Sequence, residues 1–138
     1  MASIADTKSA APPAKWMTWA GWTLTGLVAL FVAMDAAMKL MDVPQVRTAT
    51  LQLGWPLALD RTLGVIDLVC FVLYAFPRTA VLGAILMTGL LGGAIAAHLR
   101  LGDPLFSHTL FGVYIGVMAW GGLWLRDARL RTLLPLRA

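Results

Sequence analysis

Asp67 is the residue of this chain whose surroundings most favour chemistry. It lies about ten residues, or roughly 15 Å, into a long apolar stretch. If that stretch crosses a bilayer, a charged side chain there is costly, and a retained acid marks a candidate functional site. A buried carboxyl without a partner tends to be protonated. It can then donate a hydrogen bond or act as a general acid.

Two histidines, His98 and His108, lie near the facing ends of the two later apolar stretches. They could relay protons to Asp67, or simply form hydrogen bonds between helices. Their spacing of about ten residues spans a turn, and two imidazoles alone do not hold zinc. We therefore take Asp67, His98 and His108 as candidate catalytic residues and predict neither a metal site nor a haem site.

Further polar and aromatic residues share the helical faces or ends that carry these three. Gly64 lies one turn before Asp67 and leaves room for a ligand or a water molecule. Asp35 and Lys39, one turn apart, can serve the site or form a structural ion pair. The candidate ligand pocket comprises Asp35, Lys39, Asp60, Arg61, Gly64, Phe71, Tyr74, Arg100 and Asp103.

Four apolar stretches must position these residues. They cover residues 16–41, 57–76, 79–99 and 105–125, and each has about twenty residues, enough for a helix to cross the roughly 30 Å hydrocarbon core. A backbone in lipid must satisfy its own hydrogen bonds, which favours helices. The sequence therefore predicts an all-α polytopic membrane protein with a bundle of four transmembrane helices, and it allows a short interfacial helix within residues 43–56.

Composition supports this class. Apolar residues make up 59% of the 138 residues and charged residues only 13%, more apolar surface than a small soluble fold can bury. The net charge of +4 comes from scattered residues rather than a basic patch, which argues against nucleic acid. Cys70 is the only cysteine, so an internal disulfide is excluded. The expected partners are the lipid bilayer and a hydrophobic small molecule.

The two ends of the chain indicate its orientation. Residues 1–15 are rich in Ala, Pro and Ser and are expected to be a disordered tail, whereas residues 126–138 form a basic tail. Four spans place both termini on one side, and basic residues are more frequent on that side. We therefore predict cytoplasmic termini. The side with the termini carries Lys8, Lys15, Arg78, Arg126, Arg129, Arg131 and Arg137, and the other carries Lys39, Arg47, Arg61 and Arg100.

Several segments, in their order and spacing, resemble the DoxX-like family of small integral membrane proteins. The likeness covers about residues 30–125. The segments are AMKL at 37–40, LGWP at 53–56, LGVIDL at 63–68, PRTAVLGA at 77–84 and HLRLGDP at 98–104.

This resemblance implies a four-helix transmembrane bundle in a bacterial inner membrane. Some relatives are associated with sulfur oxidation and quinone-linked electron transfer, and others look like partners of thiol-redox systems. A thiol-redox role would need paired cysteines, and this chain has only Cys70. The family often has Glu at the position of Asp67. A quinone is therefore one ligand that the resemblance suggests, while the sequence itself requires no cofactor.

Three functions remain open at this stage. The bundle could bind a lipophilic ligand or quinone, or serve as accessory subunit of a membrane complex, such as a redox complex. It could instead be an isomerase- or cyclase-type enzyme with Asp67 as the acid. A small oligomeric, proton-coupled transporter would use Asp67 and Asp35 as coupling carboxylates. The sequence does not decide whether the protein is an enzyme, or whether its partner is another membrane protein or a second copy of itself.

Overall fold

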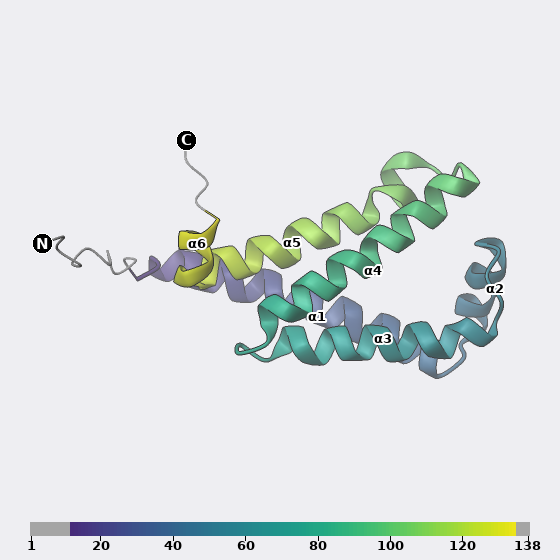
Figure 1. Cartoon of the computed structure of the whole chain (residues 1–138), viewed down its shortest axis with the longest axis horizontal. Helices are drawn as coiled ribbons and strands as arrows, with labels where there is room; N and C mark the ends of the chain where they lie inside the picture. Colours follow the sequence, from purple (N-terminus) through teal and green to yellow (C-terminus); the bar gives the residue numbers. More distant parts are fainter. Residues whose placement is uncertain (1–11, 135–138) are drawn as a thin grey trace, which may run out of the picture.

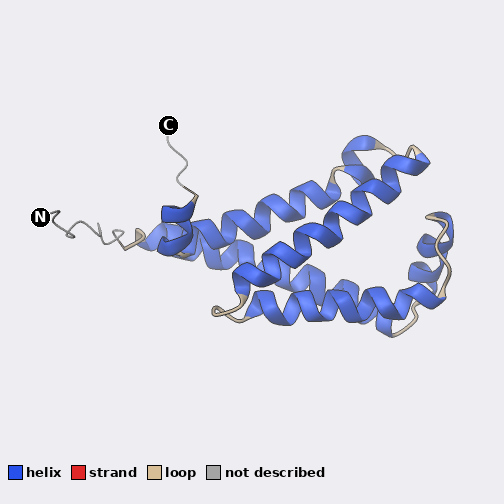
Figure 2. Cartoon of the chain, viewed as in Figure 1, coloured by secondary structure: helices blue, strands red, loops and turns tan. Residues whose placement is uncertain are grey.

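The computed structural model describes residues 12–134, and all regular structure in this part is helical (Figures 1 and 2). The elements are α1 (Lys15–Leu40), α2 (Pro44–Gln52), α3 (Ala58–Ala75), α4 (Ala80–Leu101), the π-helical turn η1 (Leu105–Thr109), α5 (Phe111–Arg126) and α6 (Ala128–Leu133). Most of the expected disordered tail, residues 1–11, lies outside the described residues, as do residues 135–138.

Three helical segments are long and apolar enough to cross a membrane. They are Lys15–Leu40, Ala80–Leu101 and Leu105–Arg126, the last comprising η1 and α5. Helix α3 has 18 residues but includes Asp60, Arg61 and Asp67. These three charged residues, rather than a lack of apolar residues, set α3 apart from the other long helices, and it packs along them.

The long helices form a closed ring of neighbours. Helix α1 packs against α3 and α5, and α4 packs against the same two helices from the other side (Figure 1). The buried core runs between them and includes Val28, Tyr74, Met87 and Leu123. Because α1 and α4 lie on opposite sides of this ring, residues at their ends meet only where loops or long side chains bring them together.

Two close helix contacts depend on glycine. A Cβ atom at Gly83 would lie 2.7 Å from the Cα atom of Tyr74, so the α3–α4 hairpin closes only without a side chain there. A Cβ atom at Gly122 would lie 2.9 Å from Oγ1 of Thr25, which brings α5 equally close to α1. Such contacts are typical of helix packing in lipid, where small residues let backbones approach.

A tight turn and a short helix join α1 to α3. Asp42 has a φ of 55°, a left-handed conformation that Asp tolerates better than most residues, and it reverses the chain after α1. Pro44 then occupies the first turn of α2, where its missing N–H is not needed. Helix α2 therefore forms within the segment 43–56 and packs against α3.

Two features at the chain's later end differ from the expected pattern. The fourth apolar stretch begins as η1 rather than as a regular α-helix, because the carbonyl of Pro104 accepts hydrogen bonds from the N–H groups of both His108 and Thr109. Part of the expected basic tail forms helix α6, whose N-cap Asp127 accepts a hydrogen bond from the N–H of Arg129. Helix α6 packs against α5 (Figure 1).

Candidate functional site

Lys39 lies between two carboxylates. Its Nζ atom donates to Oδ2 of Asp35 at 2.6 Å and to Oδ2 of Asp67 at 2.7 Å. Asp67 is only 1% exposed, so its charge is buried against α1. Gly64 lets α1 approach α3 closely enough for this contact, because a Cβ atom at that position would lie 3.0 Å from the Cβ atom of Lys39. Asp67 is therefore not a buried carboxyl without a partner, because Lys39 pairs with it.

Asp60 is the second buried carboxylate of α3, and it is only half satisfied. Its Oδ1 atom accepts a hydrogen bond of 2.5 Å from Oγ1 of Thr50 in α2. Its Oδ2 atom is buried and has no hydrogen-bond partner among the described residues. A buried acceptor without a donor is costly, so this oxygen is the polar atom of the site that most needs an external partner.

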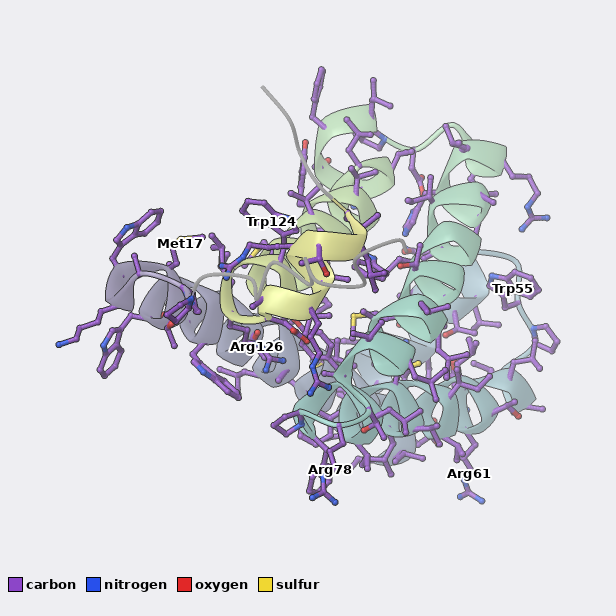
Figure 3. The ribbon with its side chains drawn as sticks, turned by 60° about the vertical axis from the view of Figure 1, so that its left-hand side comes forward. Met17, Trp55, Arg61, Arg78, Trp124 and Arg126 are labelled. Carbon is purple, nitrogen blue, oxygen red and sulfur yellow. The ribbon has the colours of Figure 1, made fainter. Side chains whose placement is uncertain are left out.

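A cavity of about 420 Å³ opens beside Asp60, at the junction of α1, α2 and α3. Figure 3 shows Arg61, one of its lining residues, extending away from the ribbon. A volume of this size is in the range of small-molecule sites. The cavity is lined by Lys39, Asp42, Arg47, Leu57, Ala58, Asp60 and Arg61.

Sequence reasoning found three of these lining residues and missed the others. Asp42 and Arg47, which form an ion pair of 2.9 Å, were not among the residues predicted for the pocket. Pro44 was the signal that could have found them, because a proline at the start of a helix would place Arg47 one turn inside it. Thr50, which holds Asp60, carried no signal of its own.

The two histidines form a separate cluster at the corner between α4 and η1. His98 and Asp103 are joined by a contact of 2.6 Å between Nδ1 and Oδ2. The rings of His98 and His108 meet edge to face, with centroids 5.8 Å apart. Gly102, at a φ of 71°, ends α4 in the left-handed conformation and turns Asp103 back toward His98.

The expected meeting of Asp67 with the histidines is not found. Neither His98 nor His108 forms a hydrogen bond or ion pair with Asp67 in residues 12–134. The reason lies in the ring of helices: Asp67 faces α1, through Lys39, whereas the histidines belong to α4 and η1 on the opposite side. The candidate catalytic residues Asp67, His98 and His108 thus belong to two clusters.

Arg100 links α4 to the segment that follows α2. Its Nη2 atom donates to the carbonyl oxygen of Leu53 at 2.6 Å. Neither Arg100 nor Asp103 lines the cavity beside Asp60. Both were expected in the ligand pocket, but Arg100 holds the segment after α2, and Asp103 pairs with His98 at the α4–η1 corner.

Phe71 and Tyr74 belong to the apolar core rather than to the cavity. Tyr74 is fully buried and donates a hydrogen bond of 3.0 Å to the carbonyl oxygen of Ala119. Phe71 packs against the same core. They share a helical face with Asp60, but Tyr74 lies about 20 Å further along the helix axis. Spacing along a helix shows which residues share a face, but it does not show which of them lie at the same position along the helix axis as the cavity.

A third polar group, which sequence reasoning missed, lies where α1 meets α5. The Nε atom of Arg126 donates to Oγ1 of Thr25 at 3.1 Å, and its guanidinium carbon lies 4.2 Å from the ring centroid of Trp22. Cation–π contacts of this kind stabilise a desolvated guanidinium. Within the part of the chain that is described, no group of three His, Cys, Asp or Glu side chains is arranged to hold a metal ion.

These features define an integral membrane protein, with helices long and apolar enough to cross a bilayer and charged side chains paired between them. The sequence profile of the DoxX-like family matches residues 23–122. The chain therefore belongs to the DoxX-like family, as its sequence motifs indicated. No curated protein and no solved structure matched it.

Proposed function

We propose that this protein binds a lipophilic molecule, with the polar head of that molecule in the cavity at the α1–α2–α3 junction. The observation that carries the proposal is the buried Oδ2 atom of Asp60, which lacks a partner within residues 12–134 and belongs to a residue lining that cavity. A ligand that donates a hydrogen bond would satisfy it. A quinone or another lipid-like molecule fits this class, bound by the protein alone or as accessory subunit of a membrane complex.

The proposal places α3 in the bilayer as a fourth span. Pairing with Lys39 at 2.7 Å compensates the charge of Asp67, and buried charges are tolerated in membranes when they are paired. Four spans would leave both termini on one side, and the basic residues near them favour the cytoplasm. Asp60 lies in the first turn of α3, so the cavity would open at the non-cytoplasmic face of a bacterial inner membrane, at head-group depth.

Ligand binding is better supported than acid–base catalysis. Asp67 is held by Lys39, and the two histidines are held in a different cluster with Asp103. General acid–base catalysis needs the groups within hydrogen-bond reach of one another or of a shared substrate. The cavity beside Asp60 contains neither the Asp67 side chain nor a histidine.

A pair of alanine substitutions in α3 tests the proposal. Ala58 lines the cavity and Ala75 is exposed at the other end of the same helix, so Ala58→Trp fills the cavity while Ala75→Trp adds the same bulk elsewhere. Each protein is purified at low detergent and examined by native mass spectrometry for bound lipid-like molecules. We expect the wild type and Ala75→Trp to retain a ligand that Ala58→Trp loses. Equal retention by both variants, or no ligand in the wild type, would refute the proposal.

A further inference from the structure

The charges that remain after pairing define what the cavity can hold. Lys39 is engaged by Asp35 and Asp67, and one guanidinium nitrogen of Arg47 is engaged by Asp42 at 2.9 Å. Two groups are left over on neighbouring residues of α3. One is Oδ2 of Asp60, and the other is the guanidinium of Arg61, which forms no ion pair with the described residues.

The Asp60 carboxylate and the Arg61 guanidinium differ in how deeply they are buried. Asp60 is 3% exposed, whereas Arg61 is exposed and extends away from the ribbon (Figure 3). Consecutive residues of a helix do not face the same direction. A ligand that satisfies both must therefore carry a donor at its inner end and an anionic group nearer to the rim.

The inner group is restricted further by the chemistry of a carboxylate. An ionised carboxylate only accepts hydrogen bonds, and bonds in which both partners are charged are the strongest. A primary ammonium group has three N–H donors and a positive charge, so it complements Oδ2 of Asp60 best. A phosphate joined to it through a two-carbon linker would reach the guanidinium groups of Arg61 and Arg47, both of which line the cavity.

The surface of α3 on the C-terminal side of Arg61 is apolar and exposed, as contact with acyl chains requires. Val65, Leu68 and Val72 follow Arg61 at helical spacing and are 51%, 41% and 42% exposed. They continue along α3 away from the cavity toward the middle of the helix. This stripe would contact hydrocarbon chains whose head group is held at Asp60 and Arg61.

We propose that the cavity selects an aminophospholipid, a lipid with a primary ammonium group next to its phosphate. The ammonium would donate to Asp60, the phosphate would rest at Arg61 and Arg47, and the acyl chains would follow the exposed face of α3. This inference rests on the proposed function and names the class of its ligand.

Two lipids with identical chains test the head-group claim on the unmodified protein. Phosphatidylethanolamine has N–H donors, whereas phosphatidylcholine is equally zwitterionic but has none. We titrate each into the delipidated protein in detergent and follow bound lipid by native mass spectrometry. Loss of a charged hydrogen bond predicts at least about tenfold weaker binding of phosphatidylcholine. Equal affinity for the two lipids overturns the inference.

Variants separate the two ends of the head group. Asp60→Asn removes the charge and is expected to abolish the preference between the lipids. Arg61→Gln is expected to weaken both lipids alike, and Arg78→Gln, an exposed arginine at the other end of α3, serves as its control. A preference that persists in Asp60→Asn, or an Arg61→Gln variant that binds like Arg78→Gln, contradicts the assignment of that end.

The outcomes also separate this inference from the proposed function. Soluble glycerophosphoethanolamine should compete with the lipid if the head group alone is recognised, and a failure to compete at millimolar concentration contradicts that recognition. If Ala58→Trp removes a bound molecule while the two lipids bind equally, the cavity binds a ligand of another class and only the aminophospholipid inference fails. If Ala58→Trp removes nothing, both fail.

Discussion

At the scale of single residues, Lys39 is the side chain on which the buried charges depend. It pairs with two carboxylates, and the two differ in their surroundings: the side chain of Asp35 is 36% exposed and that of Asp67 only 2%. Water can solvate Asp35 if the pair is broken, whereas Asp67 would remain as an uncompensated buried charge. The two halves of this arrangement should therefore respond very differently to mutation.

Lys39→Met is expected to destabilise the protein by about 3–5 kcal/mol, because it leaves Asp67 buried without a partner. Asp35→Asn should cost less than about 1 kcal/mol, since Lys39 still pairs with Asp67. Unfolding in mixed detergent, followed by circular dichroism, measures both. Combining Lys39→Met with Asp67→Leu should restore most of the loss. Equal stability of Lys39→Met and Asp35→Asn would contradict this role of Lys39.

Some of these contacts could be predicted from the sequence and others could not. The pair of Asp35 and Lys39 lies one turn apart on one helix, so spacing alone indicates it. The contact of Lys39 with Asp67 joins two helices, and it depends on how far α1 slides along α3. That register is set by packing around Gly64, which no periodicity reveals.

At the scale of elements, the helices follow from the long apolar runs, and their lateral contacts depend on where glycine permits them. Glycines occur along α4 at helix-packing spacing, but only some of them are needed. Gly83 touches the backbone of α3, whereas Gly89, Gly92 and Gly93 would have no atom within 4 Å of an added Cβ. The sequence could not separate these groups, because both consist of the same residue type on the same helix.

Gly83→Ala is expected to destabilise the α3–α4 hairpin by about 1–3 kcal/mol, because its Cβ would lie 2.7 Å from the Tyr74 Cα atom and 2.8 Å from the Leu73 carbonyl carbon. Gly89→Ala is the matched control on the same helix. It should be neutral or stabilising, since alanine favours helix by about 1 kcal/mol over glycine. Thermal unfolding in detergent compares the two, and a Gly83→Ala protein as stable as Gly89→Ala would argue against the close contact.

At the scale of the whole molecule, the ring of α1, α3, α4 and α5 divides the polar residues. Long apolar runs predicted the long helices. They did not give the order of neighbours in the ring. That order places Asp67 against α1 and the histidines at the α4–η1 corner, and so separates groups that the sequence alone brought together.

The proposed orientation is testable with single cysteines. Cys70 is the only cysteine of the sequence, so Cys70→Ser should provide a background without thiols. In that background, Leu101→Cys lies at the end of α4 that carries His98, and Arg78→Cys lies in the turn at its other end. A membrane-impermeant maleimide added to spheroplasts should label position 101 at once and position 78 only after permeabilisation. The reverse pattern would place the cavity on the cytoplasmic side.

The proposed function and the class of its ligand both require Asp60 to bind a ligand from outside the chain. A density map of the protein in nanodiscs made from its native membrane tests this directly. We predict density for a head group within hydrogen-bond distance of the Asp60 Oδ2 atom, continuing along α3 as a hydrocarbon chain. A cavity that holds only water, or an Asp60 whose second oxygen is satisfied by a protein donor, would contradict the account.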